Sequence, residues 1–317
     1  MKKGIVYDYN VAVLKKYGNK YRLSIHTALR RPGVEIDDKI KLKRCRINYI
    51  KLEESISRAR SKVKEYLLCN DWTWFVSLTI SPEKFNRYNL KEYYKNFSRW
   101  LYNMNKRRIR AGKEKIKYLF LPEMHKNGAW HMHGVIQGLN EDELRKLDYE
   151  YFTSGIPDKI RKKLEEGDTL YSWEEYKNNY GFCTLSKIKD KEKVTSYINK
   201  YLTKDICRGV TDLNANLYYC SKGLKTAKEI IRGHITNDFV YEPHYKNDYV
   251  KVLWIEDEEQ LKKVKESITK VEFNRLYMDL QDKEWVKFLK KRDDERFEED
   301  RKFVYETWGE ILKGTFK

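Results

Sequence analysis

One pair of histidines in the sequence has a spacing that suits metal binding. His131 and His133 flank Met132 in the segment WHMHGVI, and no other His-x-His occurs among the six histidines. On a strand, residues two apart point to the same face, so both imidazoles can converge on one ion while Met132 faces the core. The competing interpretation is a pair of ordinary histidines on a half-exposed strand. The pair therefore needs a further ligand before it indicates a metal site.

A carboxylate at the right distance along the chain supplies that ligand. Glu123 lies eight residues before His131, on the preceding strand of a predicted hairpin, and can face the histidines across the strand pair. Two imidazoles and one carboxylate, with positions left for water and phosphate, suit Mg²⁺ or Mn²⁺ in phosphoryl chemistry. His125 is a competing ligand, but it falls in the predicted turn.

Two tyrosines four residues apart form a second candidate group. Tyr197 and Tyr201, in SYINKYLTKD, share one face of a predicted helix. The spacing alone proves nothing, because the 25 tyrosines form five such pairs. This pair differs because Lys200 and Lys204 each follow a tyrosine by three residues. A phenol with a pKa near 10 is a poor nucleophile at neutral pH, and a neighbouring cation would stabilise the phenolate or a phosphate.

Local patterns predict the elements that must position these groups. Apolar spacing predicts helices, whereas aromatic and β-branched runs bounded by turn residues predict strands. Helices are expected over Ile50–Leu68, Leu90–Arg108 and Val194–Lys204, and strands over Trp72–Ile80, Lys117–Leu121, Ala129–Leu139 and Gly181–Ile188. This order predicts an α+β fold, with a central antiparallel sheet and helices packed on one side.

The same patterns divide the chain into three regions. Residues 1–49 alternate short apolar runs with Gly and basic residues, which predicts a β-rich lead-in. Residues 50–235 hold the candidate chemistry and include a polar insertion over 141–180 with Glu/Lys-rich helical stretches. Residues 250–317 are charge-rich and predicted to be helical. No GxxxxGK[ST] motif occurs, so nothing indicates an ATP-driven helicase.

The charge balance favours a polyanionic partner. The net charge is +18, and residues 251–317 hold 16 Lys/Arg against 17 Asp/Glu, so residues 1–250 carry +19. Such a surface favours nucleic acid and predicts salt-sensitive binding. The five cysteines form no CxxC pair, which favours reduced thiols and argues against a structural zinc site. No apolar run is long enough to cross a bilayer or to act as a secretion signal, so we expect a cytoplasmic protein.

The order of these motifs resembles a known superfamily. A hydrophobic strand ending in Thr (FVSLTI), a His-hydrophobic-His and a helix bearing YxxK follow one another as in the HUH endonucleases. SYINKYLTKD most resembles the two-tyrosine replication initiators of microviruses and filamentous phages. LLCNDWTWFVSLTI and the later YYCSKGLK are similar in character to such proteins. The resemblance extends from about Ile50 to Gly233.

The resemblance implies a fold and a reaction. The HUH/RRM-like fold has a five-stranded antiparallel sheet with helices on its back, and the metal would be held by Glu123, His131 and His133. A tyrosine would attack a single-stranded origin and form a 5′-phosphotyrosyl link, leaving a 3′-hydroxyl. Tyr201 is the favoured first nucleophile, because YLTKD resembles the YxxK(D/E) of single-tyrosine relatives. Tyr197 lies one turn earlier, where some relatives have a water-activating glutamate.

The implied partners are single-stranded origin DNA, a host helicase and a DNA polymerase in the bacterial cytoplasm. A single-tyrosine HUH transposase or a relaxase would share the chemistry, but the doubled YxxK favours the initiator. A non-catalytic single-strand binder, with aromatic residues stacking on bases, is a different class of interpretation. A metallohydrolase that uses water is another, and it would need neither tyrosine.

Overall fold

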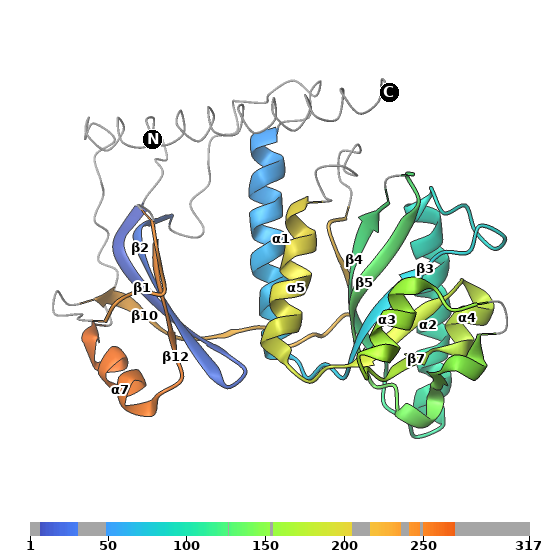
Figure 1. Cartoon of the computed structure of the whole chain (residues 1–317). Coiled ribbons are helices and arrows are strands. Elements are labelled where there is room, and N and C mark those ends of the chain that lie inside the picture. The colour runs from blue at the N-terminus through green and yellow to red at the C-terminus, as the bar shows by residue number, and fades with distance from the viewer. Residues whose placement is uncertain are drawn as a thin grey trace. The chain divides into compact units, whose positions relative to one another are not determined.

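The computed structural model describes residues 7–30, 49–125, 127–152, 155–204, 216–235, 241–247 and 250–269. The chain forms two compact units (Figure 1). The first combines Met1–Glu54 with Ala227–Lys317, and the second is Ser55–Thr226. The sequence-based division at 50, 235 and 250 therefore separates segments that the first unit joins.

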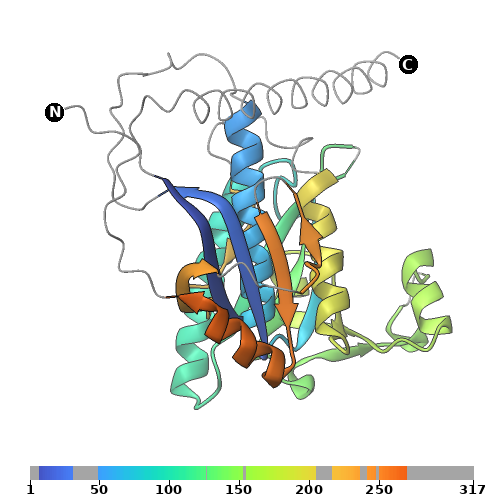
Figure 2. The ribbon, with the colours of Figure 1, turned by 90° about the vertical axis from the view of Figure 1, so that its left-hand side faces the viewer.

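The first unit is a six-stranded antiparallel sheet in the order β11-β12-β2-β1-β10-β13. Apolar residues of its strands pack with α7, which Figure 2 shows beside the sheet. The predicted β-rich runs of the lead-in lie in its first two strands. Its elements are β1 (Tyr7–Tyr17), β2 (Lys20–Arg30), β10 (Lys228–Ile235), β11 (Tyr245–Lys246), β12 (Val250–Ile255), α7 (Glu258–Ser267) and β13 (Ile268–Thr269).

The start of the region predicted to be helical is a strand instead. β12 covers Val250–Ile255 and pairs along its length with β2. Leu253 and Ile255 are buried in the core of the unit, whereas Lys251 is exposed. The β-branched and aromatic residues of VKVLWI suit a half-buried strand, and this pairing outweighs the charge-rich character of the segment that follows. Residues 270–317 lie outside the described residues.

The second unit contains a seven-stranded antiparallel sheet in the order β6-β7-β8-β3-β5-β4-β9. The predicted α+β class is confirmed. The strands are β3 (Trp74–Thr79), β4 (Lys117–Met124), β5 (Trp130–Gln137), β6 (Arg145–Leu147), β7 (Leu170–Ser172), β8 (Cys183–Lys187) and β9 (Tyr219–Cys220). The helices are α1 (Tyr49–Cys69), α2 (Leu90–Arg110), α3 (Asp158–Glu165), α4 (Glu174–Asn179) and α5 (Lys191–Lys204), with 3₁₀ turns at Glu141–Glu143 and Tyr149–Tyr151.

The alternation of β3 assigns the two faces of this sheet. Trp74, Val76 and Leu78 point into the main core, where the apolar side of α2 covers them. Phe75 and Ser77 point to the opposite face. Figure 1 shows α1 and α5 on the side of the sheet opposite α2, so helices cover both faces.

The resemblance implied five strands, and the additional strands come from parts of the chain without strand-like patterns. β6 and β7, three residues each, lie in the insertion and extend the sheet beyond β8. Two-residue β9 pairs with β4 at the other edge. The polar insertion expected to be helical is therefore partly strand, because it satisfies the open edge of β8.

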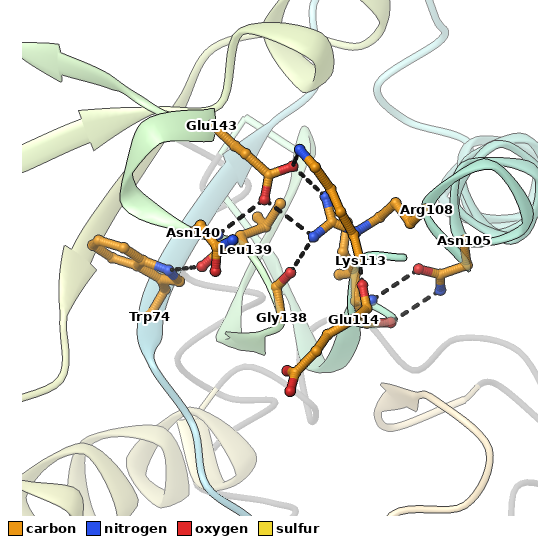
Figure 3. A network of polar contacts seen from close by, with 10 residues as sticks. Trp74, Asn105, Arg108, Lys113, Glu114, Gly138, Leu139, Asn140 and Glu143 are labelled. Carbon is orange, nitrogen blue, oxygen red and sulfur yellow. Dashed lines mark hydrogen bonds and ion pairs between the residues drawn. The ribbon is translucent and has the colours of Figure 1, made fainter. Parts of the chain in front are cut away.

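A polar network anchors the beginning of the insertion (Figure 3). Glu143 accepts hydrogen bonds from Arg108 Nη1 at 2.5 Å, Lys113 Nζ at 2.9 Å and the Asn140 backbone N–H at 3.0 Å. The Arg108 guanidinium also donates to the carbonyls of Glu114 and Gly138. Arg108 is only 7% exposed, so this network satisfies a buried charge where α2 ends.

The close approach of β4 and β5 requires glycine at position 134. A Cβ atom there would lie 2.0 Å from the Leu119 carbonyl oxygen and 2.9 Å from the Phe120 Cα atom. Both are backbone atoms of the partner strand, which cannot move without breaking the pairing. Gly134 therefore keeps in register the hairpin that carries the candidate metal ligands.

Candidate functional site

The β4–β5 hairpin brings the three predicted metal ligands together. Glu123 is paired directly with His131 across the two strands, and His133 lies two residues further along β5. The turn is closed by a hydrogen bond from the Gly128 N–H to the His125 carbonyl at 2.9 Å, and Gly128 has a φ of 81°. Met132 is fully buried in the core beneath the opposite face, as predicted.

The ligand atoms form a small triangle. Glu123 Oε2 lies 2.7 Å from both His131 Nε2 and His133 Nε2, and the two nitrogens are 2.8 Å apart. Donor atoms about 2.1 Å from an octahedral ion lie about 3.0 Å apart, so the group fits such an ion after each pair opens by about 0.2–0.3 Å. The donors, two imidazoles and a carboxylate, suit Mg²⁺ or Mn²⁺.

Ser77 fixes the orientation of one ligand. Its Oγ atom lies 2.8 Å from His133 Nδ1, and β3 pairs Ser77 directly with His133. When the Ser77 hydroxyl oxygen accepts a hydrogen bond from Nδ1–H, the lone pair of Nε2 points toward Glu123 and is available to a metal. The sequence analysis did not identify Ser77, although strand alternation places it on the same face as the histidines.

Electrostatics keep the three ligands in their metal-binding forms. Partial burial raises the pKa of Glu123, but hydrogen bonds from His131 and His133 outweigh it and hold this pKa well below the ordinary value. Burial lowers the pKa of His133, and the charge of His131 lowers it further. A deprotonated carboxylate and a neutral imidazole are the forms that bind divalent ions.

His125 is not part of the triangle. Its ring stacks on that of His131, with the centroids 4.0 Å apart and the planes at 29°. The three ligand atoms that lie together belong to Glu123, His131 and His133 alone among the described residues. His125 therefore packs against a ligand, in agreement with its predicted place in the turn.

The helix with the two tyrosines begins at a clear N-terminal cap. Asp190 Oδ1 accepts hydrogen bonds from the backbone N–H groups of Glu192 at 2.9 Å and Lys193 at 3.0 Å, which satisfies the first donors of α5. Ile198 is fully buried and Thr195 is 5% exposed, so this side of the helix packs inward. The helix contacts β4, one of the two strands that carry the triad.

Tyr197 lies on the same face of the sheet as the triad. Its ring contacts that of Phe75 edge to face, with the centroids 5.4 Å apart, and the Phe75 ring lies parallel to that of His133 at 6.3 Å. Tyr197 is 44% exposed, so its ring is packed on one side and open to solvent on the other. A single aromatic ring thus separates Tyr197 from a candidate ligand.

The other predicted residues of this helix are placed by their backbone. Lys200, Tyr201 and Lys204 occupy the last turns of α5, and Tyr201 lies one turn beyond Tyr197. Their side chains lie outside what the structure describes. The structure therefore brings together the triad and Tyr197.

Comparison with known families covers this part of the chain. Residues 73–206, the replication-associated segment, match the family model described as Replication-associated protein ORF2. Over these residues the chain belongs to a replication initiator family. The predicted resemblance to rolling-circle initiators is confirmed at this level. The replication-associated segment contains β3, the β4–β5 hairpin, the insertion and α5. No curated protein and no solved structure matches the chain.

The described part of the chain contains no helix both long enough and apolar enough to span a bilayer.

Proposed function

We propose that this protein starts rolling-circle replication by nicking single-stranded origin DNA with a tyrosine and then rejoining strands. The observation that carries the proposal is the convergence of Glu123, His131 and His133 on the sheet face where Tyr197 also lies, within the replication-associated segment. Neither a water-using metallohydrolase nor a simple single-strand binder needs a tyrosine helix beside a metal triad.

Glu123, His131 and His133 are the proposed ligands of Mg²⁺ or Mn²⁺. When bound, the ion would polarise the scissile phosphate and stabilise charge that develops on its oxygens. Ser77 holds the His133 ring in its ligand orientation. The β4–β5 pairing fixes the distance between carboxylate and imidazoles before DNA arrives.

Tyr201 is the proposed first nucleophile. Its phenolic oxygen forms a bond to phosphorus while the bond from phosphorus to the 3′ oxygen breaks. The phenolic proton leaves, and the 3′ oxygen takes up a proton to become a hydroxyl that a polymerase can extend. One phosphoester replaces another, so bond energy is nearly conserved. Lys200 and Lys204 are proposed to stabilise the phenolate or the phosphate.

Tyr197 is the proposed second nucleophile. After one round of synthesis it would attack the regenerated junction from the same helix, and the 3′-hydroxyl of the displaced strand would resolve the phosphotyrosyl link. Two tyrosines one turn apart allow this exchange without external energy. A host helicase and a DNA polymerase in the bacterial cytoplasm are the proposed partners of the initiator.

The test is covalent trapping. The full chain is incubated with pooled single-stranded fragments of its own replicon and Mn²⁺, and adducts that resist denaturant are detected. Tyr201→Phe should eliminate the first adduct. Tyr197→Phe should still form it but release fewer closed circles, and the double variant should form none. Tyr102→Phe, on the exposed side of α2, is the matched control and should react like wild type.

The metal assignment is tested in the same assay. His131→Ala and His133→Ala should abolish adduct formation while retaining most DNA affinity, because the basic surface supplies most non-specific binding. Glu123→Ala should act in the same direction. Wild-type nicking by both histidine variants in the presence of chelator would refute the metal site. An adduct with the double tyrosine variant would refute the proposed nucleophiles.

A further inference from the structure

The insertion between the second and third motifs reaches the same face of the sheet as the triad. Tyr171 of β7 belongs to the main core, so its neighbour Leu170 points to the opposite face. Leu170 pairs with Ser186, which in turn pairs with Phe75. The Phe75 ring lies parallel to that of His133. The side chains of Leu170, Phe75 and His133 therefore share one face.

Helix α3 of the insertion packs onto this face. Ile160 is 8% exposed and clusters with Leu170, and Phe182 is partly buried against the same cluster. The Phe182 carbonyl accepts a hydrogen bond from the Thr79 backbone N–H at 2.9 Å. Thr79 is the direct strand partner of His131. The apolar cluster beneath α3 thus extends to the strand position beside the triad.

Lys159 immediately precedes Ile160 and is exposed. Its neighbours on α3 have carboxylate partners, since Arg161 lies 4.0 Å from Asp158 and Lys162 lies 3.9 Å from Glu166. Among the described residues Lys159 has no such partner. Its charge is available to another anion.

The charge of Lys159 is felt at the triad. Burial is the main cause that lowers the pKa of both His125 and His133, and the Lys159 ammonium lowers both further. Exposed charges are largely screened beyond about 10 Å in ordinary salt, so an effect on both rings requires the ammonium to lie near them. Packing and electrostatics therefore agree on where this side chain lies.

We propose that Lys159 binds a backbone phosphate of the single-stranded DNA beside the metal triad, so that α3 forms one wall of the DNA-binding site. The inference rests on the proposed function and names the substrate contact made by the insertion. A lysine is a compact cation that suits phosphate without reading sequence. The acidic Glu123 close by makes such a cation useful, because DNA must approach a carboxylate.

The test compares Lys159→Ala with Lys162→Ala in the full chain. Both variants remove one positive charge from α3, but Lys162 lies on the outward side of the helix, roughly 180° from the direction midway between Ile160 and Leu164. Binding of a short oligothymidine is measured against salt, and adduct formation is measured with the replicon fragments. Lys159→Ala should weaken oligothymidine binding about fivefold and reduce the salt slope by about 0.7, as expected for the loss of one phosphate contact. Lys159→Arg should restore most of the affinity.

The outcomes separate this inference from the proposed function. Adduct formation by wild type, combined with equal binding by the two alanine variants, would overturn the role of Lys159 and leave the nuclease intact. Absence of any adduct, combined with selective loss of binding in Lys159→Ala, would overturn the nuclease and support the phosphate contact. Thermal unfolding of both variants checks that α3 remains folded. A selective loss of stability in Lys159→Ala, with oligothymidine affinity unchanged, would count against the contact.

Discussion

Replacing Ser77 by alanine should weaken metal binding without unfolding the protein. Ser77 Oγ lies 2.8 Å from His133 Nδ1, and the His133 side chain is only 13% exposed, so water replaces the lost hydroxyl poorly. The substitution leaves a buried nitrogen without its partner, which destabilises the protein by about 1–3 kcal/mol. The imidazole also loses the contact that keeps its proton on Nδ1.

The effect on metal affinity follows from the loss of this orientation. Removing a partner that orients a metal-bound histidine lowers affinity by about 10- to 100-fold, or about 1.4–2.7 kcal/mol. Mn²⁺ binding is measured by titration calorimetry on the full chain. Ser186→Ala is the matched control, because Ser186 lies on the same face of the sheet with no hydrogen bond of its side chain to a histidine in the described structure.

The reasoning is refuted if Ser77→Ala binds Mn²⁺ as tightly as wild type while it is folded. It is also refuted if Ser186→Ala loses as much affinity. In either case the hydrogen bond to Nδ1 would not determine which nitrogen faces the metal.

Two other predictions concern the polar network of α2 and the end of the chain. Arg108→Ala should destabilise the second unit by about 3 kcal/mol, because it leaves the Glu143 carboxylate without its main partner. Partial burial raises the pKa of Glu143, but Arg108, Asn140 and Lys113 hold it at about 2, so its contribution is full above the ordinary value and is lost as the pH falls from about 5 toward 2. Denaturant unfolding against pH should show this loss in wild type and not in Glu143→Gln. Deleting residues 270–317, which hold 12 Lys/Arg against 12 Asp/Glu, should leave the salt dependence of DNA binding unchanged, and a flatter slope in filter binding would contradict it. The deletion starts at 270 because β12 and α7 belong to the sheet of the first unit.

The central part of the fold could be predicted because its elements carry strong local patterns. The predicted strand Trp72–Ile80 is β3, and the helix predicted over Leu90–Arg108 is α2, which ends two residues later. Pairing of Glu123 with His131 followed from a hairpin with a short turn, since such a turn fixes the register. The triad was therefore accessible from spacing alone.

Other features depended on partners distant in the sequence. β6 and β7 are three residues long, too short for any alternation to be read, and they are strands because β8 offers an open edge. The position of α3 depends on an apolar cluster drawn from four elements, so nothing near Lys159 in the sequence indicates that it faces the triad. Ser77 was missed because serine in an apolar strand has no pattern of its own.

The arrangement of the first unit has a consequence for biosynthesis. β1 and β2 leave the ribosome first, but the strands that flank them, β10 and β12, follow only after the whole second unit. At about 5–20 residues per second, the hairpin waits roughly 10–45 s for β12 to be made. During this time the apolar side chains of Leu14 and Leu23, fully buried in the finished sheet, have no core to enter. The nascent chain therefore carries a hairpin with two unpaired edges while the replication-associated segment is already complete, which makes this hairpin the natural site for chaperone binding.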